Sequence, residues 1–259
     1  MHSFQILDSE AAAAGLSQLR DVVRDGIRDS MNDLKEFDLA NLHEHISASN
    51  VNQVRLAAFK FLNRSTGAFD ATLDQIAGHA LSDILGPDLL VQTKLNLSIQ
   101  LPGDSTSQLD LHSDCWSGDS PFQVNLWMPL TNCYGTNSMF VVPQAESFMA
   151  IRELNRNTTL NCNELRKFIL DKHFLNLRFG QAVIFNPGLI HGNVVNQTNT
   201  TRVSVNVRFK GLFSPDADRT HVSRSAGIYY RLFRLSTWTK LALDIDGVNR
   251  GNASAPGDS

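Results

Sequence analysis

Residues 182–209, AVIFNPGLIHGNVVNQTNTTRVSVNVRF, contain the pattern that decides the fold. Short apolar runs at 182–185, 192–195 and 202–209 are separated by turns rich in Gly, Pro and Asn. Such runs are typical of short antiparallel strands joined by tight connections. The last run places Val or Phe at every second position, which indicates a strand with one apolar and one polar face.

Similar runs extend upstream, so the β-rich part of the chain is predicted to begin near residue 89. Further strands are expected at residues 89–100, 124–130, 139–142 and 175–179. Elsewhere apolar residues recur at helical spacing. Helices are expected at residues 9–31, 38–46, 51–62, 71–85, 145–172 and 225–243. Helices followed by many short strands indicate an α+β protein with a β-sandwich or barrel at its centre.

The composition fits a globular protein and excludes several other classes. The chain has 259 residues, of which 42% are hydrophobic and 19% charged, with a formal net charge of -3. Near-neutrality argues against nucleic acid or an anionic membrane as a partner, and no apolar run reaches the length of a membrane span. Three cysteines at irregular spacing exclude a disulfide scaffold and a Cys-x-x-Cys zinc site. The N-terminus lacks the pattern of a secretory signal, so a cytoplasmic location is expected.

Two segments of the chain contain candidate metal ligands. His112 and Asp114 lie two residues apart in LHSD, and in an extended strand such residues point to the same side. His191, which lies 77 residues after Asp114 in the β-rich half, is the best third ligand. Two imidazoles and one carboxylate form the facial triad that holds non-haem Fe(II). His-x-Asp alone is a weak signal, because Asp114 could instead cap a turn in a surface loop.

A second signal follows His191. Arg202 lies 11 residues further along, across the polar segment NQTNTT, and a hairpin would place the two residues on adjacent strands. Arg202, Ser204, Asn206 and Arg208 share one face of the predicted strand. This face is either exposed to solvent or lines a polar cavity. In a cavity, Arg202 would pair bidentately with a carboxylate, and Ser204 would add a hydrogen bond.

These motifs resemble a known enzyme family. His-x-Asp at 112–114, His191 and Arg-x-Ser at 202–204 look like the motifs of the Fe(II)/2-oxoglutarate-dependent oxygenases, in particular the phytanoyl-CoA-dioxygenase-like branch. Residues 101–143 and 179–215 are similar to the oxygenases of bacterial carbohydrate-biosynthesis clusters, including that of the streptomycin cluster. The resemblance is confined to the β-rich part of the chain.

The resemblance implies the architecture of the whole chain. Residues 89–215 would form a double-stranded β-helix, or cupin-like jelly roll. A mainly helical part at 1–88 would buttress this core, and a C-terminal helix and loose tail would occupy 216–259. All three parts would belong to a single oxygenase domain, 1–259.

The same resemblance implies the chemistry. Iron would be bound by His112, Asp114 and His191, and 2-oxoglutarate would chelate the iron and pair with Arg202 and Ser204. With O2 as the third reactant, the enzyme would oxidise a C–H bond of a carbohydrate or carbohydrate-derived intermediate and release succinate and CO2. The partner is thus a small molecule. The sequence predicts neither the identity of this substrate nor the oligomeric state.

Four further residues are candidates for cofactor or substrate contact. Asn125 and Trp127 share one face of a predicted strand and could line the cosubstrate pocket, although Trp127 is equally well explained as core. Arg208 could bind an anionic group of the substrate or pair with a structural carboxylate. Gln100 could contact the substrate from the polar face of its strand, which a solvated face would also explain.

Two other functions fit the same architecture. One is a cupin-like, metal-dependent isomerase or hydrolase, which needs no keto acid and would keep its activity without Arg202. The other is a non-catalytic jelly roll that binds sugar without a metal.

Overall fold

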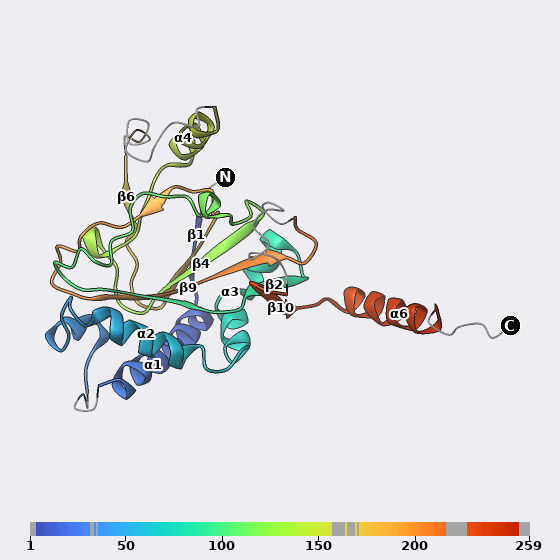
Figure 1. The fold of residues 1–259 in the computed structure, drawn as a ribbon, viewed down its shortest axis with the longest axis horizontal. Coiled ribbons are helices and arrows are strands. Elements are labelled where there is room, and N and C mark those ends of the chain that lie inside the picture. The colour runs from blue at the N-terminus through green and yellow to red at the C-terminus, as the bar shows by residue number, and fades with distance from the viewer. Residues whose placement is uncertain are drawn as a thin grey trace.

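The computed structural model describes residues 4–31, 34, 36–156, 164, 169, 171–215 and 227–253. In this part of the chain, two antiparallel sheets lie over a layer of N-terminal helices (Figure 1). The larger sheet runs in the order β1-β7-β4-β9-β2-β10, with β3 also paired to β9, and the smaller sheet runs β6-β5-β8. The predicted α+β architecture is confirmed.

The strands are short, as expected for a jelly roll. The larger sheet contains β1 (Phe4–Asp8), β2 (Leu89–Gln92), β3 (Asn96–Gln100), β4 (Gln123–Pro129), β7 (Gln181–Phe185), β9 (Arg202–Gly211) and β10 (Tyr230–Arg234). The smaller sheet contains β5 (Phe140–Val141), β6 (His173–Phe174) and β8 (His191–Gly192).

Capping residues in the sequence fix two of the helix ends, the start of α1 (Glu10–Asp29) and the end of α3 (Asp70–Leu85). Further helices are α2 (Val51–Leu62), α4 (Gln144–Arg156) and α6 (Thr237–Ala253), with the 3-10 segments η1 (Leu39–Glu44), η2 (Asp114–Ser117) and η3 (Gly135–Asn137). Helix α1 begins after Ser9, whose hydroxyl accepts a hydrogen bond from the Ala12 N–H. Helix α3 ends at Gly86, where a φ of 88° favours glycine and stops the helix before Pro87.

Strand β9 separates the hydrophobic core from the polar interior of the jelly roll. Val203, Val205, Val207 and Phe209 are fully buried in one cluster with the apolar faces of α1, α2 and α3. Successive side chains of a strand point to opposite faces, so the alternate residues of β9 point away from these helices. The N-terminal helices therefore support the larger sheet from behind and leave its other face free for a site.

The structure corrects the predictions at both ends of the chain. Strand β1 lies in the part expected to be helical; it is mostly exposed and forms by pairing with β7, a long-range contact that local periodicity does not reveal. Strand β10 occupies the first part of the helix expected at 225–243, because it pairs with β2, and α6 begins only after it.

Two predicted elements in the middle of the chain are also corrected. The strand expected at 89–100 is divided, since β2 and β3 pair with different parts of β9 and the chain bends between them. The strand expected at 175–179 is not formed, and Leu177 makes only an isolated bridge with Cys133. Helix α4 fills the first half of the helix expected at 145–172, and most of the second half lies outside the described residues.

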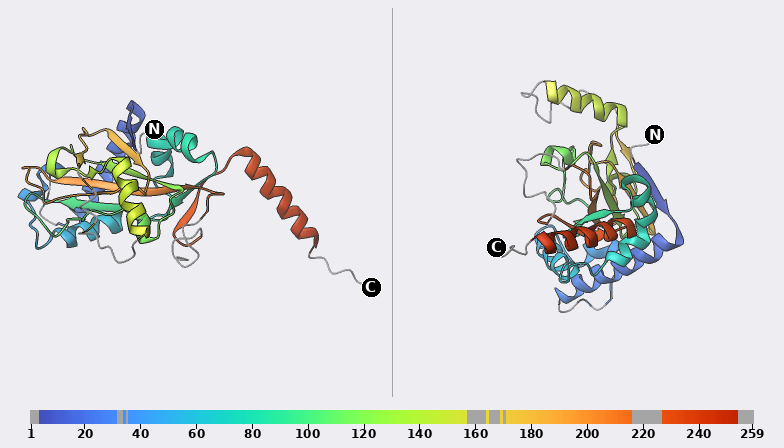
Figure 2. Two further views of the ribbon diagram at one scale, coloured as in Figure 1. Left: turned by 90° about the horizontal axis from the view of Figure 1, so that it is seen from above. Right: turned by 90° about the vertical axis from the view of Figure 1, so that its right-hand side faces the viewer.

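Helix α6 extends away from the sheets and from the N-terminal helices (Figures 1 and 2). It is attached at its start, where the Asp88 carboxylate accepts hydrogen bonds from the Ser236 N–H and the Thr239 hydroxyl at 2.6 and 2.8 Å. Most side chains at 237–247 are exposed, with Trp238 at 82%. Among the helices of the described ranges, none is long and apolar enough to cross a membrane.

Candidate functional site

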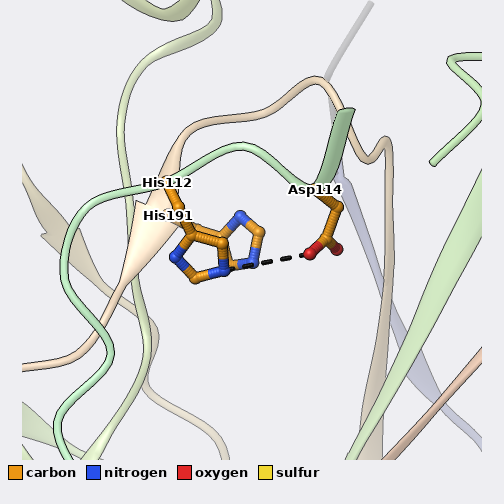
Figure 3. A group of neighbouring side chains, drawn as sticks. All are labelled: His112, Asp114 and His191. Atoms are coloured by element: carbon orange, nitrogen blue, oxygen red, sulfur yellow. Dashed lines mark ion pairs between the residues drawn. The ribbon is translucent and has the colours of Figure 1, made fainter. Parts of the chain in front are cut away.

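The two predicted imidazole ligands are held together by their own backbones. His112 and His191 form an isolated bridge, in which each N–H donates to the other residue's carbonyl at 2.9 Å. Their ring centroids are 4.3 Å apart. Segments that lie far apart in the sequence thus meet where the loop before η2 passes β8 (Figure 3).

Each imidazole is fixed in one tautomer. Nδ1 of His112 lies 2.7 Å from the Asp110 carbonyl oxygen, and Nδ1 of His191 lies 2.8 Å from the Leu189 carbonyl oxygen. A carbonyl can only accept, so each Nδ1 carries a hydrogen, and Nε2 is the nitrogen of each ring that could bind a metal. This orientation by backbone carbonyls is the usual arrangement around metal-binding histidines.

Asp114 completes the cluster, although it does not lie in a strand. It begins the 3-10 segment η2, so the extended geometry predicted for 112–114 ends at Ser113. The carboxylate still faces the imidazoles, with Oδ1 at 3.8 Å from His112 Nε2 (Figure 3). One ligand atom from each of His112, Asp114 and His191 lies within 4.8 Å of the others.

Both carboxylate oxygens of Asp114 have further partners. Oδ1 accepts from Nη2 of Arg208 at 3.1 Å, and Oδ2 accepts from the side-chain amide of Asn125. Arg208 also forms an ion pair with Asp119, with Nε 2.8 Å from Oδ2. Arg208 thus pairs with two carboxylates, of which Asp119 is structural and Asp114 is the candidate metal ligand.

The electrostatics of the site favour the protonation states that bind a metal. Burial lowers the pKa of His191 to about 4, and the neighbouring His112 contributes in the same direction, so His191 is neutral near pH 7. Burial alone would raise the pKa of Asp114, but Arg208, the two imidazoles and Asn125 together hold it below its ordinary value. The cluster therefore offers imidazole nitrogen and carboxylate oxygen to a cation, a donor set that suits Fe(II).

A cavity of about 790 Å³ lies against this cluster. The polar face of β9 lines it through Arg202, Ser204, Asn206 and Arg208, so that face looks into the cavity rather than to bulk solvent. Trp127 also lines it and packs in a hydrophobic cluster with Phe185, so it is in part a core residue.

Arg202 is a buried cation without an anionic partner. It is 4% exposed, and its Nη2 donates to the Ser98 hydroxyl at 3.2 Å. Its Nε is buried without a hydrogen-bond partner, and within the described ranges Arg202 forms no ion pair. Burial lowers the pKa of this guanidinium, and the nearby Cys133 thiol acts in the opposite direction. A charge left in this state calls for an anionic ligand.

The predicted hairpin between His191 and Arg202 is wrong. Strand β8, which contains His191, pairs with β5 in the smaller sheet, whereas β9 pairs with β3 and β4 in the larger one. The connecting segment folds on itself, because Asn196 accepts from the Thr198 N–H and donates to the Thr200 carbonyl. His191 and Arg202 therefore reach the same cavity from different sheets.

Two other predicted residues take structural positions. Asn125 does not line the cavity, and its side-chain amide donates a hydrogen bond to the Asp114 carboxylate. Gln100 is fully buried and donates to the Val194 carbonyl, so it lies outside the cavity lining as well. It thus ties β3 to the segment after β8.

Sequence reasoning missed two residues that the structure places at the site. Ser98, the partner of Arg202, lies directly opposite Ser204 in the β3–β9 register, and the alternation of 96–100 could have identified it. Asp119, the partner of Arg208, comes from a loop after η2, and no local signal marks it.

Comparisons with known proteins agree with this geometry. No family model matches the chain. It is 28% identical over 124 residues to the streptomycin biosynthesis protein StrG of Streptomyces griseus, a match that covers 47% of this chain and 46% of that protein. The chain thus matches less than half the length of this curated relative.

Solved structures resemble the chain over most of its length. The non-haem monooxygenase ThoJ in complex with Ni has a TM-score of 0.50 at 16% identity, covering 91% of this chain and 81% of that one. SnoN, an α-ketoglutarate-dependent epimerase from nogalamycin biosynthesis, has 0.50 at 12%, covering 91% and 93%. EctD from S. alaskensis, with 2-oxoglutarate and 5-hydroxyectoine, has 0.50 at 13%, covering 82% and 73%. The predicted jelly roll is thereby confirmed, and the chain has the double-stranded β-helix fold of the non-haem iron, 2-oxoglutarate-dependent oxygenases.

Proposed function

We propose that this protein is an Fe(II)- and 2-oxoglutarate-dependent oxygenase that oxidises a C–H bond of a carbohydrate or carbohydrate-derived molecule. The observation that carries the proposal is the pairing of two features in one cavity. A cluster of two imidazoles and a carboxylate lies at the same cavity as a buried arginine that forms no ion pair within the described part of the chain.

The residues divide into two groups with separate tasks. His112, Asp114 and His191 would hold the iron through Nε2, a carboxylate oxygen and Nε2. Arg202 would pair with the carboxylate of 2-oxoglutarate that does not chelate the metal, with Ser204 as an additional donor. When bound, iron with 2-oxoglutarate and O2 supplies the oxidising chemistry and releases succinate and CO2. The chain itself positions the reactants and limits the access of water.

Arg202 separates this proposal from the alternatives. A metal-dependent isomerase or hydrolase uses the metal cluster but has no need of a desolvated guanidinium, whose burial is unfavourable without an anion. A sugar-binding jelly roll needs neither feature. A dicarboxylate cosubstrate accounts for both, because one end of it reaches the metal and the other reaches a cation.

A carbohydrate substrate is supported by two lines of evidence. The similarity to StrG, although partial, involves a protein of streptomycin biosynthesis. The cavity wall is also rich in side-chain amides and hydroxyls, which suit a polyhydroxylated ligand. These residues are Asn52, Asn96, Ser98, Thr106, Ser107, Gln108, Asn193, Ser204 and Asn206.

The direct test is anaerobic addition of Fe(II) and 2-oxoglutarate to the protein. We expect a visible charge-transfer band in the wild type and in Arg178→Ala, a control that removes an exposed arginine paired with Asp8. The band is expected to be absent in His191→Ala and to need far more 2-oxoglutarate in Arg202→Ala. A folded, iron-loaded wild type without the band would contradict the proposal.

A second measurement addresses the substrate. Candidate sugars and activated sugars are incubated with Fe(II), 2-oxoglutarate and O2, and succinate is quantified. A carbohydrate substrate is expected to increase succinate formation above the uncoupled rate. Metal-dependent conversion of a sugar that persists in Arg202→Ala without succinate would favour the isomerase or hydrolase.

A further inference from the structure

The cavity contains one more arginine, on the side of α2. Arg55 lines the cavity beside Asn96 and Ser98 of β3. Its Nε and Nη2 donate to the side-chain oxygen of Asn52 at 3.3 and 2.7 Å, and its Nη1 lies 3.5 Å from the Leu97 carbonyl oxygen. A guanidinium offers five N–H groups, so these neutral partners leave N–H groups of Nη1 and Nη2 for a ligand.

Asn52 is unusual among the residues that hold helical arginines in this protein. Other arginines pair with an acid three residues earlier in the same helix, which neutralises them. These pairs are Arg24 with Asp21, Arg28 with Asp25, and Arg156 with Glu153. At Arg55 the same position is occupied by an asparagine, which orients the guanidinium but leaves its charge intact. Within the described part of the chain, Arg55 makes no ion pair.

Neighbouring carboxylates do not compensate this charge. In the loop that contributes Thr106, Ser107 and Gln108 to the cavity wall, Asp104 accepts hydrogen bonds from Thr106 and Ser107, and Asp110 accepts one from Gln108. Neither aspartate belongs to the cavity lining, where Asp114 is the sole carboxylate found in the described ranges.

When the site holds Fe(II) and 2-oxoglutarate, the other charges at the cavity balance one another and the positive charge of Arg55 remains. This step rests on the proposed function. Asp114 and the two carboxylates of 2-oxoglutarate would offset the charges of Fe(II) and Arg202. Asp119 offsets Arg208, to which it is ion-paired. The charge that remains at the cavity is that of Arg55, and it lies on the helix side rather than among the iron ligands.

We propose that Arg55 recognises an anionic group of the substrate, either a carboxylate or a phosphate, on an otherwise polyhydroxylated molecule. The adjacent wall suits the neutral part of such a ligand. Asn96 and Asn206 are direct neighbours in the β3–β9 register, both line the cavity, and neither side chain has a hydrogen-bond partner among the described residues. Together they offer amide donors and acceptors for hydroxyl groups next to the charged contact.

The test is calorimetric titration of the protein loaded anaerobically with Fe(II) and 2-oxoglutarate. The probes are glucuronate, glucose 6-phosphate and, as a neutral match, glucose. The wild type is expected to bind at least one anion roughly tenfold or more tightly than glucose, as a charge-assisted pair predicts. Arg55→Gln should lose this preference, and Arg55→Lys should keep part of it. Arg64→Gln, which removes an arginine stacked on Phe61 just after α2, should leave it unchanged.

The affinity for 2-oxoglutarate, measured in the same proteins, separates this proposal from the proposed function. It should be the same in the wild type and all three variants. If 2-oxoglutarate binds but neither anion is preferred over glucose, or the preference survives in Arg55→Gln, the role of Arg55 is wrong and the oxygenase assignment stands. If the wild type does not bind 2-oxoglutarate at all, the oxygenase assignment itself fails.

Discussion

A guanidinium that is buried without a counter-ion raises the free energy of the folded protein, and among the described residues Arg202 has no counter-ion. The hydrogen bond that its guanidinium donates there goes to the neutral hydroxyl of Ser98. We therefore explain Arg202 by the ligand that it binds, since residues of functional sites are often retained although they make the folded protein less stable. Removal of its charge should therefore lower the affinity for the anionic ligand and raise the free energy of unfolding.

We predict this opposition for Arg202→Met, which keeps an unbranched apolar side chain. The free energy of unfolding of the metal-free protein should rise by about 1 kcal/mol or more, because an unpaired buried charge is lost. The affinity for 2-oxoglutarate should fall by about two orders of magnitude, as expected when a bidentate ion pair is lost. Denaturant unfolding and calorimetry measure the two effects. A variant that is less stable and still binds 2-oxoglutarate normally would show that Arg202 is structural.

Asn125 illustrates a residue that acts through another. Its amide donates to Asp114 and does not reach the cavity, so it is a positioning residue for the carboxylate. We predict that Asn125→Ala weakens Co(II) or Fe(II) binding by about 10- to 100-fold, the usual effect of removing such a partner. Asn132→Ala serves as the control, since Asn132 accepts from the Phe179 N–H away from the cavity. Equal metal affinity in both variants would show that Arg208 alone orients Asp114.

At the scale of elements, the short strand β8 depends on close packing. A Cβ added to Gly192 would lie 2.9 Å from the Leu109 carbonyl oxygen and 2.9 Å from the Phe140 ring. We predict that Gly192→Ala lowers the free energy of unfolding by about 1–3 kcal/mol and weakens metal binding, because β8 must shift and takes His191 with it. Gly247→Ala in α6 meets nothing within 4 Å and should be neutral or slightly stabilising. Unaltered stability and metal affinity in Gly192→Ala would mean that the segment around Leu109 moves to accommodate the added methyl group without a loss of free energy.

The start of α6 has a pH dependence of its own. The Ser236 N–H, and then the Thr239 and Ser236 hydroxyls, donate to Asp88 and lower its pKa below 3.8, although desolvation acts in the opposite direction. A lowered pKa means that this interaction is fully present above pH 3.8 and is lost as the pH falls through the lower folded-state value. The protection of the Ser236 and Thr239 amides against hydrogen exchange, corrected for the intrinsic exchange rate at each pH, should therefore fall at acidic pH, and Asp88→Asn should show the lower protection already at pH 7. Protection that is independent of both changes would contradict this role.

The elements also show what local sequence can and cannot predict. The alternation at 202–209 correctly predicted that Arg202 and Arg208 share a face, because alternation is a property of one strand. It could not show which strands pair with β9, so His191 was wrongly placed beside Arg202 in a hairpin. Strands β1 and β10 escaped prediction for the same reason, since each forms through a partner far away in the sequence. Asp119 has no local signature at all.

At the scale of the whole molecule, the N-terminal helices support one face of the larger sheet, and the candidate site lies on the other face. The apolar face of β9 packs with the N-terminal helices, and its polar face lines the cavity, which residues of both sheets enclose. Helix α6 belongs to neither layer. It leaves the body after β10 (Figure 2). Trp238, Leu241 and Ile245 along it are all exposed.

Removal of α6 should therefore spare both the fold and the site. A chain that ends at Ser236 retains β10 and the hydrogen bonds from Ser236 to Asp88. The side chains lost at 237–247 mostly face solvent, and changes at such positions usually alter the free energy of unfolding by no more than about 0.5 kcal/mol each. We predict that the melting temperature and the affinity for 2-oxoglutarate stay close to those of the full chain. If the shortened protein instead loses 2-oxoglutarate binding while it remains folded, α6 must act on the cavity in a way that its extended position does not explain.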